Sequence, residues 1–159
     1  MSVLSWTLPV VEDDGQGKRR RLGPEEVWQG LLRKAENPVP FIAGITACEV
    51  LERQDDGLLR QITVAGQAKA RERAVFHDHR LMVFHQLDDP YLAEIHNEIG
   101  RDEQGATTLT IRVVLSAEGE AKSERDPSFT RSTAQYFGSI VQPIVDSIVR
   151  MHAQPAPRP

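Results

Sequence analysis

The sequence predicts an α+β fold in which a curved, seven-strand antiparallel sheet wraps around a long C-terminal helix. The segment Asp126–His152 keeps one unbroken helical periodicity of apolar residues, which is typical of an amphipathic helix. The segment Ile45–Ser116 is typical of short strands separated by turns. A long amphipathic helix that follows such strands buries its apolar face on their sheet. One helix cannot cover a flat sheet of this size, so we expect the sheet to curve around it.

Composition and charge indicate one globular domain. The chain has 159 residues, of which 40% are hydrophobic and 26% are charged, and its net charge is -4. We therefore expect a single domain over residues 1–152 and a disordered tail over residues 153–159. An acidic domain lacks the basic surface by which proteins bind nucleic acid. The basic run Lys18–Arg21 is interpreted as part of a solvated loop, with an anion-binding patch or a localisation signal as the alternatives.

Two further features bear on the cellular compartment. The single cysteine, Cys48, excludes an internal disulfide and suits a reducing environment. The N-terminal residues lack a basic segment followed by a long apolar one, so we expect no signal peptide and no membrane span. The sequence therefore predicts a cytoplasmic protein.

The N-terminal part predicts a strand, a loop and a helix. Side chains alternate over Ser2–Val11, and Pro9 favours an edge or an end of that strand because proline cannot donate a backbone hydrogen bond. The charged segment Glu12–Gly23 is expected to be a loop. A helix is expected from Pro24 to about Glu36, since proline suits the first helical position and acidic residues follow it.

A short linker and six strands follow. Phe41–Gly44 is expected to be an apolar linker with one helical turn. Turn residues divide the next part of the chain into an antiparallel meander of short hairpins. The expected strands are Ile45–Arg53, Leu58–Ala65, Ala68–His77, Arg80–Gln86, Tyr91–Gly100 and Ala106–Ser116.

The C-terminal part predicts a polar loop over Ala117–Arg125 and then the long helix. Asp126 is a suitable N-cap, and Pro127 suits the first helical position. Pro143 lies inside the helix and removes one backbone hydrogen bond. We expect a kink at this position that bends the helix and widens the space beneath it.

Several packing segments carry a resemblance to a known family. They are Glu26–Leu31, Lys34–Pro38, Phe41, Gly44–Ile45, Cys48–Glu52, Leu59–Arg60 and Arg71–Arg73. In these segments and in the order of its elements, the chain resembles the START-like helix-grip superfamily, also called SRPBCC, and most closely its AtaL-like branch. The chain departs from the pattern at Leu22–Gly23, where a Thr or Ser cap is expected, and in the extended basic loop before it.

The resemblance implies a cavity between the sheet and the long helix, used for lipids, polyketides, hormones or other apolar molecules. Some members of the superfamily are cyclases or aromatases, and others are carriers or co-chaperones. A fold shared by so many activities does not select one of them. We expect no cofactor.

Arg60 and Glu72 form the most informative polar pair. A three-residue connection between their strands places Arg60 opposite Glu72, whereas a two-residue connection would place it opposite Arg73. Like charges in direct opposition are destabilising, so the first register is predicted. The pair then lies among apolar neighbours on the concave face. It either anchors a ligand or supplies an acid–base carboxylate, or it is a buried ion pair that only satisfies itself.

The remaining candidate site residues are mostly apolar. Asn97 shares a strand face with Ile95 and Ile99, and it either orients a ligand or bonds a neighbouring side chain or buried water. The side on which Phe84 lies cannot be fixed, because its strand is apolar on both faces. The candidate ligand-binding residues are Phe41, Arg60, Ile62, Glu72, Phe76, Ile95, Asn97, Phe137, Ile140, Val141 and Ile144.

Metal and thiol chemistry find little support in the sequence. His77, His79, His85 and His96 have no Cys or carboxylate at a recognised ligand spacing, so hydrogen-bonded or solvated histidines are expected and no metal site. Cys48 has no histidine at a diagnostic spacing and is expected to be a small buried apolar residue.

Three functions are consistent with these observations. The first is a binding protein for a small apolar molecule, which we favour over a catalyst. The second is an enzyme of the polyketide cyclase or aromatase type that uses Glu72 and Arg60. The third is a structural or interaction domain with a filled interior. The sequence leaves open whether the chain forms a homodimer.

Overall fold

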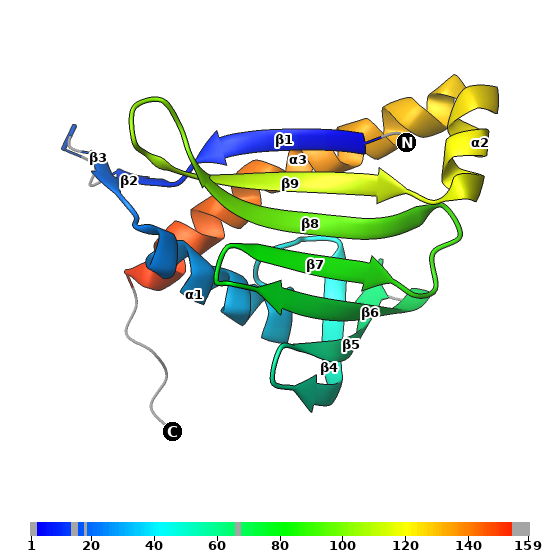
Figure 1. The fold of residues 1–159 in the computed structure, drawn as a ribbon, viewed down its shortest axis with the longest axis horizontal. Coiled ribbons are helices and arrows are strands. Elements are labelled where there is room, and N and C mark those ends of the chain that lie inside the picture. The colour runs from blue at the N-terminus through cyan, green and yellow to red at the C-terminus, as the bar shows by residue number, and fades with distance from the viewer. Residues whose placement is uncertain (1–2, 14–15, 18, 66–67, 154–159) are drawn as a thin grey trace.

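A curved antiparallel sheet of seven strands forms the body of the protein, as Figure 1 shows. The computed structural model describes residues 3–13, 16–17, 19–65 and 68–153. The strands neighbour one another in the order β1-β9-β8-β7-β6-β5-β4, and each pairs antiparallel with the next. Their bounds are Val3–Pro9 (β1), Ile45–Gln54 (β4), Gly57–Val64 (β5), Ala68–His77 (β6), Leu81–Gln86 (β7), Leu92–Arg101 (β8) and Thr107–Leu115 (β9).

The predicted sheet and meander are therefore confirmed, and each strand lies within a few residues of its predicted bounds. β1 closes the far edge of the sheet by pairing with β9, the last strand. Pro9 ends this edge strand, where its missing N–H leaves no ladder bond unmade. Side chains of β1 alternate between exposed and half-buried, as expected for a strand with one covered face.

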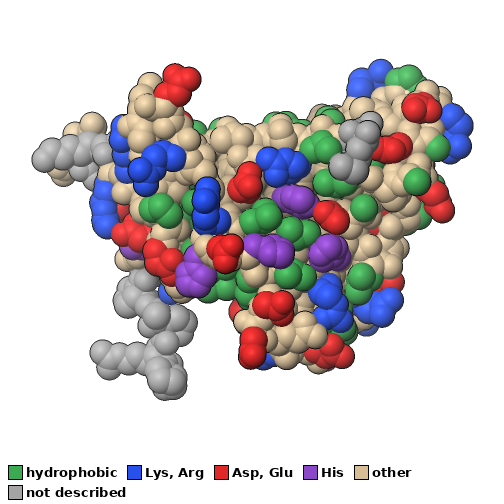
Figure 2. Space-filling view, viewed as in Figure 1, with side chains coloured by type: hydrophobic (Ala, Val, Ile, Leu, Met, Phe, Trp, Pro, Cys, Tyr) green, Lys and Arg blue, Asp and Glu red, His purple; other side chains and the backbone are tan. Residues whose placement is uncertain are grey.

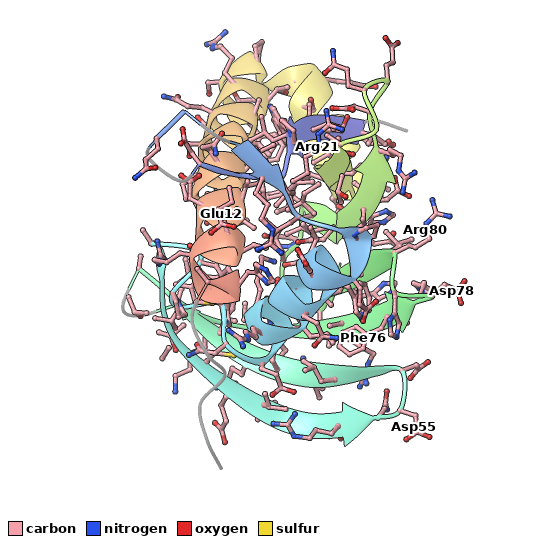
Figure 3. All side chains as sticks on the ribbon, turned by 90° about the vertical axis from the view of Figure 1, so that its left-hand side faces the viewer. Glu12, Arg21, Asp55, Phe76, Asp78 and Arg80 are labelled. Atoms are coloured by element: carbon pink, nitrogen blue, oxygen red, sulfur yellow. The ribbon has the colours of Figure 1, made fainter. Side chains whose placement is uncertain are left out.

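The sheet curls so that β4 and β5 fold back beneath the helices, as Figures 1 and 3 show. Register shifts in β4, between Ile45 and Ala47 and between Val50 and Glu52, mark irregularities of the kind that bend a strand. Asp55 and Asp78 lie at hairpin tips (Figure 3). This curvature gives the sheet the concave face that the sequence predicted.

Helix α1, Pro24–Glu36, forms where the sequence predicts it. Gly23 occupies the N-cap position. The backbone N–H of Gly23 donates a hydrogen bond of 3.2 Å to the carboxylate of Glu26. This bond from the Gly23 N–H to Glu26 satisfies one free donor at the helix end without the Thr or Ser cap that the family pattern leads one to expect. Asn37 ends the helix before Pro38, which disfavours helical geometry in the residue that precedes it.

Helix α3, Pro127–His152, is the long helix that the concave face surrounds. The Asp126 side chain caps it by accepting from the backbone N–H of Ser128 at 3.0 Å. Its buried stripe is Phe137, Val141, Ile144, Val145, Ser147 and Ile148. Pro143 is exposed, on the side away from the sheet. A bend at such a position is convex toward solvent; the predicted widening of the cavity stays a prediction.

The two long helices meet through a small residue. A Cβ added to Gly30 of α1 would lie 2.8 Å from a methyl carbon of Ile148 in α3. Glycine therefore permits the close approach of the helices at this point. The contact places α1 against the C-terminal end of α3, over one end of the concave face, as Figure 3 shows.

Two segments that the sequence assigns to loops are ordered elements, so both predictions are wrong. Ala117–Arg125 is helix α2, because Ser116 caps its first turn by accepting from Gly119 N–H at 3.0 Å. Acidic residues in its first turn and basic residues in its last also favour the helix. The short strands Val11–Asp13 (β2) and Arg19–Arg21 (β3), which occupy part of the predicted loop Glu12–Gly23, pair as a separate two-stranded ribbon. Lys18 and the tail from residue 154 lie outside the described residues.

Candidate ligand-binding cavity

A cavity of about 420 Å³ lies between the concave face of the sheet and α3. Its wall is mainly apolar, with a cluster of polar side chains among the buried part of the lining. The lining residues are Lys34, Ile42, Ile45, Arg60, Ile62, Val64, Ala68, Lys69, Ala70, Glu72, Phe84, Gln86, Asp88, Asp89, Pro90, Leu92, Ile95, Asn97, Ile111, Tyr136, Phe137, Ile140 and Ile144.

Most of the residues that the sequence singles out meet at this cavity. Eight of the predicted ligand-binding residues belong to its wall: Arg60, Ile62, Glu72, Ile95, Asn97, Phe137, Ile140 and Ile144. Whether these side chains contact a ligand stays a prediction.

Phe41, Phe76 and Val141 lie outside this wall and pack elsewhere. Phe76 lies on the concave face but beside α1, with its ring edge against Trp28 at a centroid distance of 6.0 Å (Figure 3). Phe41 is buried in the turn after α1. Val141 follows Ile140 on the helix and is rotated by about 100° from it, which directs it into the core instead.

The ion pair of Arg60 and Glu72 has the predicted register. Arg60 of β5 lies opposite Glu72 of β6, and Val64 lies opposite Ala68. The Arg60 side chain donates twice to one oxygen of Glu72, through Nε at 3.0 Å and Nη2 at 2.7 Å. Both side chains are buried, with 2% and 6% of their surfaces exposed. Each charge therefore has a direct partner where water does not reach it.

Arg60 also closes the end of α1. Its Nη1 donates to the backbone oxygens of Lys34 at 2.9 Å and Ala35 at 3.0 Å. Carbonyl groups in the last turn of a helix lack intrahelical partners and carry partial negative charge. Arg60 thus fixes α1 to the sheet, which is a structural task in addition to its pairing with Glu72.

The second oxygen of Glu72 is also occupied. It accepts from Nε2 of Gln86 at 2.7 Å, and the same nitrogen donates to the Phe84 backbone oxygen at 3.2 Å. Both carboxylate oxygens are therefore engaged by neighbouring side chains. This arrangement makes Glu72 better suited to hold Arg60 in place than to take a proton from a substrate.

Lys34 is the polar residue that the functional prediction missed. It lies in the last turn of α1 and is only 4% exposed, although lysine is seldom fully buried. Its pKa is lowered from the ordinary value of 10.5 to about 7, mainly by burial and also by nearby Arg60, while Glu72 opposes the shift. The signal was present in the sequence, because Lys34 follows Val27 and Leu31 at the spacing of the helix's apolar stripe.

Lys34 and Asn97 meet across the buried polar cluster. The Nζ of Lys34 donates to Oδ1 of Asn97 at 3.1 Å. Since a lysine ammonium only donates, this bond fixes Asn97 with its oxygen toward Lys34. Asn97 is 0% exposed, and its Nδ2 has no hydrogen-bond partner among the described residues. A buried donor left in this way is unusual in a folded protein.

Phe84 lies beneath both cations. It pairs with Ala74 and Ile95 across its neighbouring strands, which places it on the concave face that the sequence could not assign. The centre of its ring lies 4.5 Å from Lys34 Nζ and 4.5 Å from the guanidinium carbon of Arg60. The negative face of an aromatic ring attracts cations at this distance, so Phe84 stabilises two positive groups that have little contact with water.

Exposed residues mark the open side of the cavity. Lys69, Asp88, Asp89 and Tyr136 belong to its lining and are exposed. Asp88 is paired with Arg71 at 2.8 Å, and hydrogen bonds from Arg71 lower the pKa of the Asp88 carboxyl to about 2. Partial burial raises the pKa of the Tyr136 phenol. The cavity therefore runs from a charged opening to the buried cluster around Lys34.

The histidines and the cysteine form no second site among the residues described. Histidine side chains gather on the outer face of the sheet (Figure 2), where Glu94 lies 2.7 Å from His96 and 3.7 Å from His85. His79 stacks on Trp28 and contacts Glu25. No described group of three His, Cys, Asp or Glu is arranged to hold a metal ion. Cys48 is partly rather than fully buried, and burial raises the pKa of its thiol.

The curved sheet, the long helix and the cavity between them are the helix-grip arrangement of the START-like superfamily. A family model described as "Acetylaranotin biosynthesis cluster protein L", AtaL, matches residues 5–154. The chain therefore belongs to the AtaL family. A search of the curated proteins gave no match.

Solved structures of low sequence identity share this fold. The di-domain ARO/CYC BexL from the BE-7585A biosynthetic pathway aligns with a TM-score of 0.66 and 13% identity over 98% of this chain. This chain spans about half of BexL, 51% of its length. Zhui aromatase/cyclase from a Streptomyces species aligns with a TM-score of 0.58 and 15% identity, over 95% of this chain and 93% of that one.

A START superfamily protein from Mycobacterium smegmatis aligns with a TM-score of 0.56 and 11% identity, over 94% of this chain and 95% of that one. Likenesses at such identities establish the fold and leave the activity open. No helix in the described part of the chain is long and apolar enough to cross a membrane.

Proposed function

We propose that this protein binds a small apolar molecule in the cavity between the concave face of the sheet and α3. The observation that carries the proposal is the cavity itself, with a volume of about 420 Å³. Pockets for small molecules commonly measure about 300–1,000 Å³, and they combine apolar walls with a few polar groups that orient the ligand. The wall here has that composition.

The comparisons support the same class of function. Two of the solved structures with this fold are named as aromatase/cyclase proteins, which is consistent with a cavity that takes up an organic molecule. A filled interior, the third alternative from the sequence, has no support in a structure with a cavity of this size.

The second alternative, a cyclase or aromatase that uses Glu72 and Arg60, has less support than binding. Both oxygens of Glu72 accept hydrogen bonds from neighbouring side chains, and Arg60 is bound to Glu72 and to the end of α1. A general base must reach the proton that it removes. Glu72 would have to give up buried partners to do so. Binding without turnover is therefore the function that the geometry supports best.

A neutral fluorescent probe tests the proposal. Aminoanthracene is titrated into the purified protein, and its emission is expected to rise with saturation at a single site. Ile140→Trp places an indole in the cavity wall and is expected to weaken binding by about tenfold or more, while both variants stay folded by circular dichroism. Gln142→Trp is the matched control, because Gln142 is exposed on the same helix and does not line the cavity.

Equal binding by the two variants would place the probe elsewhere on the protein and contradict the proposal. Absence of saturable binding to the unsubstituted protein, over a series of apolar probes, would also contradict it.

A further inference from the structure

At the buried end of the cavity, the polar side chains carry more hydrogen-bond donors than their neighbours accept. Lys34 carries three N–H donors and makes one hydrogen bond, to Asn97. Asn97 contributes a further donor, Nδ2, which is buried and has no hydrogen-bond partner in the described part of the chain. The acceptors are used: Glu72 bonds Arg60 and Gln86, and the Asn97 oxygen bonds Lys34. The polar groups of Lys34 and Asn97 that are free to bond a ligand are therefore hydrogen-bond donors.

The charges at this end are unequal as well. Arg60 and Glu72 offset each other within their ion pair. Lys34 forms no ion pair with any carboxylate of the residues described; its other close contact is the ring of Phe84. A buried cation without a counter-charge is costly unless an anion joins it. Apart from Arg60, Glu72 and the charged groups at the opening, the side chains that line the cavity with Lys34 carry no charge; Tyr136 is the titratable one among them, and partial burial raises its pKa.

We infer that the ligand of this cavity is an apolar acid, whose carboxylate or other anionic oxygen bonds Lys34 and Asn97 while its apolar part lies against the isoleucines of the wall. This inference rests on the proposed function, which it extends by naming the polar group of the ligand. An anionic oxygen supplies both the acceptor and the counter-charge that the cluster lacks. Charge-assisted hydrogen bonds of this kind are about twice as strong as neutral ones.

The inference predicts a characteristic dependence of affinity on pH. Burial places the pKa of Lys34 near 7 in the ligand-free protein. A bound anion favours the charged amine, so the complex retains the proton to higher pH. Affinity for an acid should then be highest below pH 7 and fall toward tenfold per pH unit above it. The charged groups at the opening of the cavity are Lys69, Asp88 and Asp89.

The experiment compares decanoic acid with decanol, which has the same chain length and no charge. Binding is measured by isothermal titration calorimetry at pH 6.5 and pH 8.5, below the critical micelle concentration of the acid. We expect the acid to bind at least tenfold more tightly than the alcohol at pH 6.5. We expect its affinity to fall by about tenfold or more at pH 8.5, while that of the alcohol is unchanged.

Two variants assign the effect to a residue. Lys34→Met keeps an unbranched side chain and removes the charge, so it should abolish the preference for the acid and the pH dependence, with decanol binding retained. Lys122→Met removes a positive charge from α2, outside the cavity lining, and should leave both properties intact. Lys69→Met tests the other lysine of the lining, at the exposed opening. If Lys34→Met does not fold, the pH profile of the unsubstituted protein still decides.

The outcomes separate the inference from the proposed function. Equal affinity for the acid and the alcohol, or a preference for the acid that Lys34→Met retains, would overturn the inference and leave apolar binding established. Loss of the preference in Lys69→Met alone would place the acid at the opening and also overturn it. Binding of neither compound would count against the inference, and loss of aminoanthracene binding would in addition count against the proposed function.

Discussion

Replacing Lys34 by methionine should stabilise the ligand-free protein, by an amount that depends on pH. Methionine is unbranched and flexible, so it can follow the path of the lysine chain through the core. It removes an amine that is 4% exposed and whose pKa is lowered, mainly by burial, from 10.5 to about 7. A lowered lysine pKa means that the folded state resists protonation, and the charged amine therefore opposes folding.

The sign and size of the effect follow from linkage. Below pH 7 Lys34 is protonated in both the folded and the unfolded chain, and the whole cost of burying the charge is present. Between pH 7 and pH 10.5 only the unfolded chain holds the proton, so the stability of the unsubstituted protein rises with pH. At about 1.4 kcal/mol per pKa unit, a pKa lowered from 10.5 to about 7 corresponds to about 5 kcal/mol as an upper bound. About 2–3 kcal/mol of this cost in folding free energy disappears as the pH rises from 6 to 9.

The assay is urea unfolding of the unsubstituted protein and Lys34→Met at several values between pH 6 and pH 9. We expect the advantage of the variant to be largest at pH 6 and to shrink by about 2–3 kcal/mol by pH 9. Lys69→Met controls for charge alone, because Lys69 is exposed. A difference between the unsubstituted protein and Lys34→Met that stays constant over this range would refute the reasoning, as would one that widens with pH.

Three further predictions concern the fold around the cavity. Glu72→Gln leaves the buried charge of Arg60 without a counter-charge and should lower the free energy of unfolding by about 3 kcal/mol; a change below about 0.5 kcal/mol in urea unfolding would show that the pair contributes little. In Gly57→Ala the added Cβ would lie 2.0 Å from a backbone oxygen of β6, so we expect a loss of about 3 kcal/mol or more. Gly23→Ala, where a Cβ meets nothing within 4 Å, is its control, and equal losses would contradict the steric reason. Pro143→Ala restores a backbone donor, so a crystal structure should show a straighter α3 and a smaller cavity; an unchanged helix would remove the proposed role of the proline.

The parts of the fold that depend on regular patterns could be predicted from the sequence. Alternation and turn residues located the seven strands, and avoidance of a like-charge pair selected the register of Arg60 and Glu72, which the structure has. Helix α2 was missed because its polar sequence has no apolar stripe, and its stability comes from the cap of Ser116 and from the charges at its ends. Caps of this kind are local, and a polar segment with a serine before it resembles a loop equally well.

The site was predicted less completely than the fold. Its apolar wall follows from strand and helix periodicity, which is why Ile62, Ile95, Ile140 and Ile144 were placed correctly on the cavity. The position of Lys34 depends on how α1 meets β8 across the cavity, a contact between distant parts of the chain. A lysine near the end of a helix is usually solvated and favoured there by the helix dipole, so its burial was not inferred.

Uptake of a small apolar molecule by the cavity can be observed directly by methyl NMR of isoleucine-labelled protein. Seven isoleucines line the cavity, namely Ile42, Ile45, Ile62, Ile95, Ile111, Ile140 and Ile144. Ile99 and Ile148 are buried but do not line it, so they serve as internal controls. On titration with decanol, we predict saturable shifts concentrated in the lining methyl groups, with Ile99 and Ile148 little changed. Shifts spread evenly over all isoleucines, or confined to residues outside the lining, would contradict binding of the molecule in the cavity.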